Sequence, residues 1–310
     1  MTKSVLTVTL NPAIDKIVHV NNFCVGDDFR SSKVALSAGG KGINVSRALN
    51  CLGISNIATG FLGGTSGDFI EKKLKTERIE NAFLKIQSES RTNLTIIDQK
   101  NKITRILESG ATVSNNNLRR FKRHFNGLLK KCDIVIFSGS IAPGLPKSIY
   151  FDLIQMAHHR GVKTILDTNG NPLRLALRAK PFAVKPNLSE AEFVLGEKLN
   201  SLNKKKAAVK YLLEKSQIVI LSLSQQGAIV GWQDQFFLAS PSKLMCVNNV
   251  GCGDSLVAGF IYALKNNFSF EKSVRFAVAI GSADVLTLTS GEISKKDIKK
   301  ILPKILLRRL

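Results

Sequence analysis

Long apolar segments, paired cysteines and acidic residues are all scarce in this 310-residue sequence. No uninterrupted apolar run approaches the roughly 18 residues of a membrane-spanning helix, and residues 1–8 lack the long apolar stretch of a secretory signal peptide. The five cysteines are odd in number and form no Cys-x-x-Cys pair, which indicates reduced thiols rather than a disulfide scaffold. We therefore expect a soluble cytoplasmic protein with no membrane partner.

The shortage of acidic residues leaves a strong positive charge. There are 45 Lys and Arg against 23 Asp and Glu, so the formal net charge is +22. Such a balance suits an anionic partner, for example nucleic acid, acidic lipid or phosphorylated metabolites. The basic residues are nevertheless scattered along the chain, without zinc-finger spacing or an aromatic-interleaved basic ribbon. We interpret most of them as solvent-exposed surface and expect no specific nucleic-acid partner.

The hydrophobic pattern predicts a single α/β domain over residues 1–310. Short continuous apolar runs are typical of strands buried on both faces of a sheet, and segments with helical apolar spacing lie between them. The predicted strands are residues 5–10, 133–137, 163–166 and 218–221, and the predicted helices are residues 147–160 and 204–215. This alternation predicts a parallel sheet covered on both faces.

Two segments do not fit this alternation. Residues 92–97 and 103–107 are β-rich runs joined by a polar turn, which predicts a hairpin. It could stand outside the main sheet as a lid or dimer surface, or it could be an edge hairpin of that sheet. Residues 295–310 form a basic amphipathic pattern interrupted by Pro303. For this segment we expect a terminal helix packed on the core, with membrane-surface binding as the alternative.

The strongest chemical signal is NVGCGDSLVAGF at residues 249–260. Gly251 and Gly253 let the backbone expose N–H groups at the start of a helix, which makes a site for an anion. Asp254 would repel a bound phosphate there. It is well placed, however, to take a proton from an attacking hydroxyl while the amides stabilise the transferring phosphoryl group. The alternative is that Asp254 only caps the helix.

Two further motifs precede it in the chain. SAGGKGINVSRALNCLG (37–53) is a glycine-rich helix start that places Lys41 and Asn44 where they could bind a small polar ligand, and it is not a Walker A loop. TLNPAID (9–15) puts Asp15 after a strand end and an Asn-Pro turn. A carboxylate there can accept hydrogen bonds from a polyol, or it can serve as an ordinary turn residue.

Together these motifs resemble a ribokinase-like carbohydrate kinase of the phosphofructokinase B family. Within that family the chain is similar to the branch that contains 1-phosphofructokinase and tagatose-6-phosphate kinase. The matching stretches occur in family order and span nearly the whole chain: TLNPAID (9–15), GGKGINVSRAL (39–49), SRTN (90–93), SGSIAPGLP (138–146), LDTNG (166–170), KPNLSEAE (185–192), SLSQQGA (222–228) and NVGCGDSLVAGF (249–260).

The resemblance implies a three-layer α/β/α ribokinase-like fold with a mostly parallel sheet. It also implies a small β lid built from segments near 10–36 and 88–110. ATP and Mg²⁺ would be the cofactors and a phosphorylated ketohexose the other substrate, and the resemblance allows a homodimer formed through the lid.

The resemblance also implies a role for each matching position. Asp254 would deprotonate the sugar hydroxyl, and the amides of Gly251, Cys252 and Gly253 would form the anion hole. The residues expected to hold the sugar phosphate are Asp15, Gly39, Gly40, Lys41, Asn44, Arg91 and Ser138. Those expected at the nucleotide are Lys185, Asn187, Glu190, Ser222, Ser224, Gly227 and Ser282, with Glu190 meeting Mg²⁺ through water.

Several positions depart from the family pattern, among them Ala142 in place of a proline and Ala111 after Gly110. Cys252 stands where the usual GAGD turn has alanine, and a small side chain leaves the backbone amides in place. It could make the site sensitive to oxidation, or it could be a simple filler. Ser224 replaces a glycine of the nucleotide loop. TLTSGE at residues 287–292 replaces a PGT pattern, so the resemblance carries no expectation of activation by a monovalent cation.

The function expected from these residues is ATP-dependent phosphorylation of fructose 1-phosphate to fructose 1,6-bisphosphate. Arg91 offers a fork suited to phosphate oxygens and Lys41 a point charge, and a kinase for an uncharged sugar would not need both. Tagatose 6-phosphate and fructose 6-phosphate are the alternative acceptors. Two other classes stay open: a ribose or nucleoside kinase, and a non-catalytic protein whose basic surface binds nucleic acid.

Overall fold

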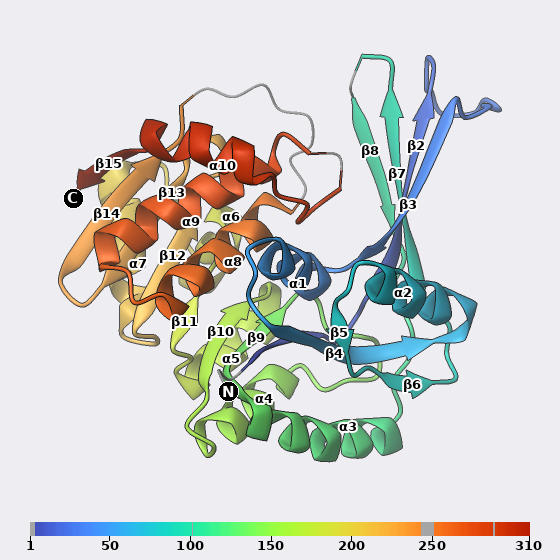
Figure 1. Cartoon of the computed structure of the whole chain (residues 1–310), viewed down its shortest axis with the longest axis horizontal. Coiled ribbons are helices and arrows are strands. Elements are labelled where there is room, and N and C mark those ends of the chain that lie inside the picture. Colours follow the sequence, from blue (N-terminus) through green and yellow to red (C-terminus); the bar gives the residue numbers. More distant parts are fainter. Residues whose placement is uncertain (1–3, 101, 243–250, 288) are drawn as a thin grey trace.

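The computed structural model describes residues 4–100, 102–242, 251–287 and 289–310. Strands and helices alternate along most of the chain (Figure 1). The strands are β1 (Ser4–Thr9), β2 (Ala13–Val20), β3 (Lys33–Gly39), β4 (Asn56–Gly63), β5 (Glu80–Asn81), β6 (Leu84–Ile86), β7 (Arg91–Asp98), β8 (Ile103–Leu107), β9 (Cys132–Ser138), β10 (Lys163–Asp167), β11 (Ala183–Val184), β12 (Ile218–Ser222), β13 (Ala228–Trp232), β14 (Gln235–Ser240) and β15 (Leu306–Arg309).

The helices connect these strands. They are α1 (Lys41–Cys51), α2 (Gly64–Thr76), α3 (Asn115–Leu128), α4 (Ile149–His158), α5 (Gly170–Ala176), α6 (Leu188–Leu195), α7 (Leu202–Leu213), α8 (Cys252–Lys265), α9 (Phe270–Asp284) and α10 (Lys295–Ile301). Short 3₁₀ turns follow α3, α5, β12 and α10 at η1 (Leu129–Lys131), η2 (Leu177–Ala179), η3 (Ser224–Gln226) and η4 (Leu302–Lys304). Within the described residues no helix is both long and apolar enough to cross a membrane.

A large sheet forms the middle of the body. Its strand order is β15-β14-β13-β12-β11-β10-β9-β1-β4-β5, with β6 also paired to β4. The pairs from β12 to β5 are parallel, and the three pairs from β12 to β15 are antiparallel. The chain therefore starts in the interior of the sheet, at β1, and builds outward on both sides. Ligands of open parallel sheets bind beyond the carboxyl ends of the strands at such a point.

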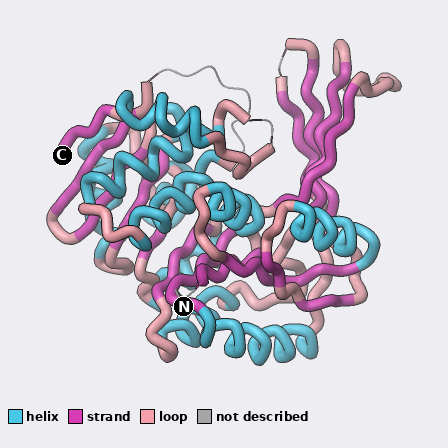
Figure 2. The backbone as a smooth tube through the Cα atoms, in the orientation of Figure 1, coloured by secondary structure: helices cyan, strands magenta, loops and turns pink. Residues whose placement is uncertain are grey.

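The sheet is covered by helices on both faces because its strands are apolar on both faces (Figure 2). In β9, Val135 and Phe137 join one buried cluster, with side chains of α3, α4, α5, α6 and α7. Ile134 and Ile136 of the same strand join the other cluster, with α1, α8, α9 and α10. Full burial of each such side chain contributes about 1.5–3 kcal/mol. The predicted three-layer α/β/α arrangement is confirmed.

A second, four-stranded sheet stands away from the body as a lid, in the order β3-β2-β7-β8 (Figure 1). The predicted hairpin is its β7–β8 pair, which excludes the edge-hairpin alternative because β7 and β8 do not pair with the large sheet. β2 pairs with β7 in parallel, so two segments far apart in sequence form the lid sheet together. Its two faces carry different side chains, because Asp15 and Asn93 pair on one face while the alternate residues form the other.

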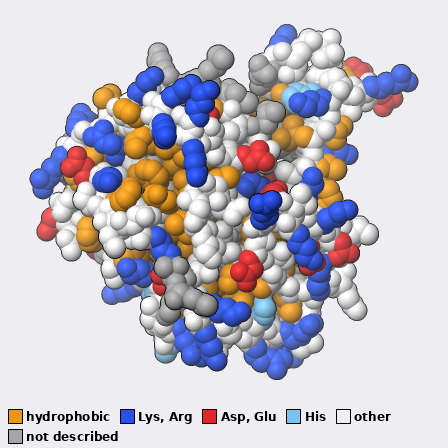
Figure 3. All heavy atoms as spheres, viewed as in Figure 1, with side chains coloured by type: hydrophobic (Ala, Val, Ile, Leu, Met, Phe, Trp, Pro, Cys, Tyr) orange, Lys and Arg blue, Asp and Glu red, His pale blue; other side chains and the backbone are white. Residues whose placement is uncertain are grey.

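The C-terminal expectation was wrong in part. Residues 295–310 do not form one helix: α10 ends at Ile301, η4 contains Pro303, and the chain then enters β15 antiparallel to β14. Proline has no N–H for a helix interior, and β14 offers an unpaired edge that the last residues complete. Of the five cysteines, the four that the structure describes (Cys24, Cys51, Cys132 and Cys252) form no disulfide. Lys and Arg side chains are dispersed over the face in Figure 3.

Candidate active site

Side chains from several strand ends and two helix starts meet at the carboxyl edge of the large sheet. Ser138 is the last residue of β9 and Asp167 the last of β10, and the two are paired in the sheet register. Lys185 follows β11 directly, and its backbone N–H donates to Leu166 O (2.9 Å). Asp254 belongs to the first turn of α8. The sheet thus brings together residues separated by more than a hundred positions.

Asp254 is the buried carboxylate at the centre of this group. Its side chain is 5% exposed, and its Oδ2 accepts a hydrogen bond from Asn44 Nδ2 on α1 (2.9 Å). Burial raises the pKa of Asp254 to about 7, with the negative charge of Asp167 adding to the effect. The residue at the N-cap of α8 is Gly251, and no side chain caps that helix end. Asp254 therefore does not cap the helix.

Two lysines and two further carboxylates lie beside Asp254. Lys41 Nζ is 3.1 Å from Asp167 Oδ1 and 3.7 Å from Glu190 Oε1, and Lys185 Nζ is 3.2 Å from the same Asp167 oxygen. Burial alone would raise the pKa of Asp167, but the Lys185 and Lys41 charges lower it, so Asp167 remains ionised. The Asp167 charge in turn raises the pKa of Lys41, against the opposing effect of burial. Lys41 is therefore cationic in the site, and Lys185 forms an ion pair with the same Asp167 oxygen.

The turn before α8 has the backbone that an anion hole needs. Gly251 has φ +88°, and a Cβ there would lie 2.4 Å from Ser290 Cβ, so only glycine fits. Cys252 and Gly253 are the first two residues of the helix, where backbone N–H groups lack intrahelical acceptors and the helix dipole favours negative charge. A Cβ on Gly253 would lie 3.4 Å from Lys185 Nζ, so that cation borders the same spot.

The foot of the lid supplies a second group. Asp15 Oδ1 accepts a hydrogen bond from Asn93 Nδ2 (2.9 Å), and burial raises the pKa of Asp15 despite that bond and the nearby Arg91 charge. A Cβ on Gly39 would lie 2.0 Å from Asp15 Oδ2, so glycine is required for the carboxylate to lie there. Gly40, with φ +113°, is the N-cap of α1. The two glycines bring Asp15 and the start of α1 together.

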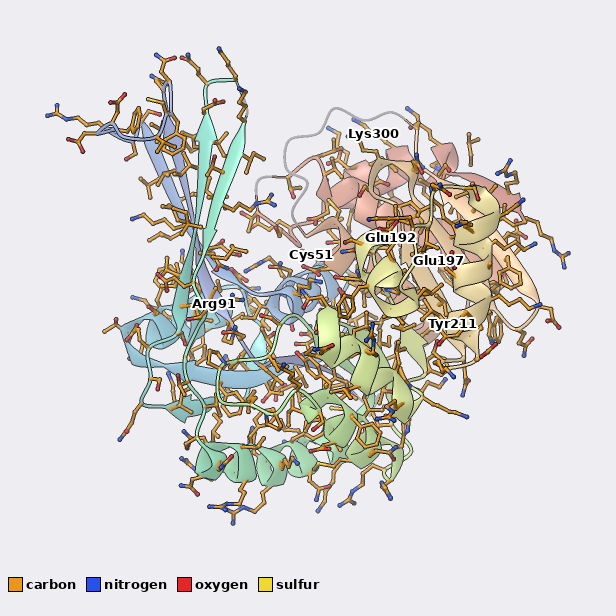
Figure 4. The ribbon with its side chains drawn as sticks, turned by 180° about the vertical axis from the view of Figure 1, so that it is seen from behind. Cys51, Arg91, Glu192, Glu197, Tyr211 and Lys300 are labelled. Atoms are coloured by element: carbon orange, nitrogen blue, oxygen red, sulfur yellow. The ribbon has the colours of Figure 1, made fainter. Side chains whose placement is uncertain are left out.

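Arg91 lies where β7 meets the body (Figure 4). Its Nη1 donates to Glu108 O and its Nη2 to Asn11 O, both at 3.0 Å, while its buried Nε has no partner among the described residues. A cavity of about 360 Å³ lies beside it, lined by Glu89, Ser90, Arg91, Glu108, Ser109 and Gly110. Two backbone carbonyls therefore hold the Arg91 guanidinium at the edge of this cavity. Lys41, expected in the same group, instead points to Asp167 and Glu190.

The expected nucleotide residues fall into two sets. Asn187 and Glu190 form a capping box at the start of α6: Asn187 Oδ1 accepts from Glu190 N–H, and Glu190 Oε2 accepts from Asn187 N–H, both at 2.8 Å. Ser222 bridges to Asn187 across the sheet edge. This set is continuous with Lys185 and the carboxylate cluster.

The second set lies further out. Ser224 has φ +52°, the left-handed conformation that a glycine at this position would adopt without strain. Gly227 has φ +89°, and a Cβ there would lie 1.9 Å from Ala239 O. Ser282 donates its hydroxyl to Val278 O of its own helix (2.7 Å), so only its acceptor lone pairs are available to a ligand.

Two side chains of this cluster were not predicted individually from the sequence. Asp167 lies within the quoted LDTNG stretch, and its signal was a carboxylate at the end of a buried strand. Arg47 lies within GGKGINVSRAL and is bonded to Asn44 at 3.3 Å. Arg47 had no sequence signal, because an arginine after several helical residues is normally an exposed surface residue.

Several buried polar atoms at this edge and in the adjoining lid strand β7 have no partner among the described residues. They are Thr9 Oγ1, Ser138 Oγ, Asp167 Oδ2, Arg91 Nε and Asn93 Oδ1. Buried polar groups are normally hydrogen-bonded, so a cluster of exceptions at a sheet edge indicates a place for a polar ligand. Asp167 Oδ2 and Glu190 Oε1 also fit Mg²⁺, which binds through one or two carboxylates together with substrate phosphates and water. No group of three His, Cys, Asp or Glu side chains in the described chain forms a protein-only metal site.

Comparison with known proteins finds similarity over nearly the whole chain. The model of the pfkB family carbohydrate kinases matches residues 8–296. The tagatose-6-phosphate kinase of Staphylococcus epidermidis is 35% identical over 305 residues, covering 97% of this chain and 98% of that enzyme. The 1-phosphofructokinase of Bacillus subtilis is 34% identical over 308 residues, covering 99% and 100%. A solved structure described as a possible 1-phosphofructokinase of Thermotoga maritima superposes with TM-score 0.90 at 33% identity, covering 99% of each chain.

Proposed function

Since the chain belongs to the pfkB family of carbohydrate kinases, we propose that it transfers the γ-phosphoryl group of ATP to a hydroxyl of a ketohexose phosphate. The first candidate acceptor is fructose 1-phosphate, which gives fructose 1,6-bisphosphate. The observation that carries this proposal is the buried Asp254 carboxylate beside the Gly251 turn, with Lys185 at the same spot. A base, an anion hole and a cation thus lie within one site.

Asp254 acts as the general base. The acceptor hydroxyl passes its proton to the Asp254 carboxylate as its oxygen attacks the γ-phosphorus of ATP, and ADP leaves on the opposite side. A base is most effective when its pKa lies near the working pH, and the pKa of about 7 meets that condition. The hydrogen bond from Asn44 Nδ2 fixes one carboxylate oxygen and leaves the other for the hydroxyl.

The negative charge of the transferring group is met by fixed dipoles and cations. The first N–H groups of α8 point outward from the helix start, and Lys185 Nζ lies beside Gly253. Asp167 holds Lys185 and Lys41 in place by ion pairs, so neither lysine must be ordered when ATP binds. Asp167 and Glu190 would hold Mg²⁺, which supplies further charge neutralisation for the phosphates when bound.

The sugar phosphate is bound at the foot of the lid. Arg91 is a fork for phosphate oxygens, while Asp15 accepts hydrogen bonds from sugar hydroxyls. Fructose 1-phosphate and tagatose 6-phosphate each carry the phosphate at one end and the acceptor hydroxyl at the other. A cation at the lid and a base at α8 suit both, and relatives named for each activity are about equally similar to this chain. Tagatose 6-phosphate is therefore the second candidate, ahead of fructose 6-phosphate.

The substrate is tested by a coupled ADP-release assay across fructose 1-phosphate, tagatose 6-phosphate, fructose 6-phosphate, ribose and adenosine. We expect kcat/KM for fructose 1-phosphate to exceed that for ribose or adenosine by at least about 10². Without the phosphate, a charge-assisted hydrogen bond is lost and polar groups of the site are left unpaired. Highest turnover with an unphosphorylated acceptor would refute the proposal, and highest turnover with tagatose 6-phosphate would select the second candidate.

The lid also supports a homodimer formed through it. On the face opposite Asp15, Val18 pairs with Val34 on one side and Ile96 on the other, and the next row contains Leu36, Lys16, Leu94 and Ile106. Val34, Leu36 and Ile106 are 49%, 45% and 56% exposed, although the same face packs on α2 nearer the body. Exposed apolar side chains in a row favour burial, and a second copy related by a two-fold axis could cover them.

Analytical ultracentrifugation tests this dimer. The wild-type protein should sediment with twice the monomer mass, and Leu36→Arg should sediment as a monomer. A wild-type monomer at micromolar concentration would contradict it.

A further inference from the structure

Arg47, on α1, is almost fully buried next to the active site. Its side chain is 4% exposed, although arginine is rarely buried without several partners. It does not belong to the groups that would touch ATP or the sugar phosphate, because Asn44 stands between it and Asp254. Its place in the protein therefore requires another explanation.

Every N–H of the Arg47 guanidinium is used. A guanidinium has five N–H donors in a rigid planar fork, and the structure shows five acceptors for them. They are Glu77 Oε2 from Nε (2.8 Å), Asn44 Oδ1 (3.3 Å) and Ser290 O (2.7 Å) from Nη1, and Ala38 O (2.8 Å) and Glu77 Oε1 (3.2 Å) from Nη2. Lysine, with three donors on one atom, could not reproduce this set.

These acceptors come from separate parts of the site. Ala38 lies in β3, the lid strand that ends next to Asp15. Ser290 is the residue whose Cβ limits Gly251 to glycine, so it packs on the anion-hole turn. Glu77 follows α2 and balances the buried charge. One side chain thus ties the lid foot and the anion-hole turn to the helix that carries Asn44.

The contact with Asn44 has a specific chemical consequence. An Asn side chain can present either its oxygen or its NH₂ group to a neighbour. Because Arg47 donates to Asn44 Oδ1, that oxygen must face Arg47, and the NH₂ group must face Asp254 Oδ2. If the amide turned over, its oxygen would face the carboxylate of the base and repel it.

We propose that Arg47 is a positioning residue for phosphoryl transfer, which acts through Asn44 to orient Asp254 and holds the lid foot and the anion-hole turn in register with it. The role rests on the proposed kinase function. It differs from simple stabilisation, because a buried ion pair is often no more stabilising than apolar side chains of similar size. The main effect of Arg47 on kcat is proposed to pass through Asn44.

A double-mutant cycle in kcat tests the role. The variants are Arg47→Lys, which keeps the charge beside Glu77, Asn44→Ala, and the two combined, assayed with fructose 1-phosphate and ATP. We expect Arg47→Lys to lower kcat about tenfold while KM for ATP stays within twofold. In the Asn44→Ala background the same substitution should change kcat by less than about threefold, because its target is already absent.

Control and backup variants separate this role from folding. Lys122→Met removes the Lys122–Asp152 ion pair between α3 and α4, away from the site, and should leave kcat within twofold. If Arg47→Lys does not fold, Arg47→Met combined with Glu77→Met removes both buried charges and replaces it in the cycle.

Two results would overturn the role of Arg47 but not the proposed kinase function. They are an equal loss of kcat on Arg47→Lys in the wild-type and Asn44→Ala backgrounds, and a kcat of Arg47→Lys within twofold of wild type. A wild-type enzyme inactive on every sugar phosphate would instead overturn the proposed function, and this role with it.

Discussion

Replacing Asp254 by Asn removes the general base and leaves its shape almost unchanged. The new amide oxygen can still accept the hydrogen bond that Asn44 Nδ2 now gives to Asp254 Oδ2 at 2.9 Å, so we expect the fold and ATP affinity to be retained. Without a base, kcat should fall by roughly 10² to 10⁴, the range for loss of a positioned proton acceptor. The coupled ADP-release assay gives kcat, and calorimetric titration gives the ATP dissociation constant.

The same substitution should also change how stability depends on pH. The folded pKa of about 7 lies above the ordinary value of 3.8, so the unfolded chain ionises first as the pH rises and stability falls between about pH 4 and pH 7. About three pH units at 1.4 kcal/mol each give an upper figure on the order of 4 kcal/mol. Asp254→Asn should thus raise the free energy of unfolding at pH 8 and change it little at pH 4.

Two results would refute this reasoning. A kcat within threefold of wild type would show that Asp254 is not the base. An equal stability change at pH 4 and pH 8, measured by denaturant titration, would show that the carboxylate is not held in a desolvated site.

Three further predictions concern the pH dependence of kcat, the sugar-phosphate pocket and the turn before α8. In wild type, kcat should rise with pH through about 7 as Asp254 ionises, and a flat profile from pH 5 to 9 would exclude it as the titrating group. Arg91→Ala should raise KM for the sugar phosphate about 10- to 100-fold with little change in KM for ATP; the exposed Arg119→Ala on α3 is the control, and an unaltered KM would remove Arg91 from the pocket. Gly251→Ala should lower kcat at least tenfold and Tm by several degrees, since its Cβ would lie 2.4 Å from Ser290 Cβ. Gly127→Ala on α3, with open space around it, should leave kcat unchanged, and a Gly251→Ala enzyme as active as that control would show that the turn tolerates a side chain.

The central sheet could be predicted because its strands carry their own signal. Residues 133–137, 163–166 and 218–221 are short segments rich in apolar residues, and in the structure these apolar side chains alternate between the two buried clusters. Motif spacing likewise placed Asp254 at a helix start, where α8 begins at Cys252. Local sequence is sufficient in these cases because burial on both faces and glycine conformations leave few alternatives.

Other features depend on contacts that no local pattern contains. β15 is a strand because β14 presents an edge to it, although residues 295–310 have helical spacing. The pairing of Lys41 with Asp167 could not be predicted, because the two residues lie 126 positions apart in the sequence. Arg47 is buried only because Glu77, Ala38 and Ser290 converge on it from three parts of the chain. Such arrangements become visible only when the strands are assembled.

The most direct test of the account is a crystal structure with fructose 1-phosphate and a non-hydrolysable ATP analogue bound together. We predict that the 6-hydroxyl of the sugar lies within about 3.2 Å of an Asp254 carboxylate oxygen and in line with the γ-phosphorus, with the phosphate of the sugar against Arg91. A 6-hydroxyl beyond hydrogen-bond reach of Asp254 in that closed complex would contradict the assignment of the base.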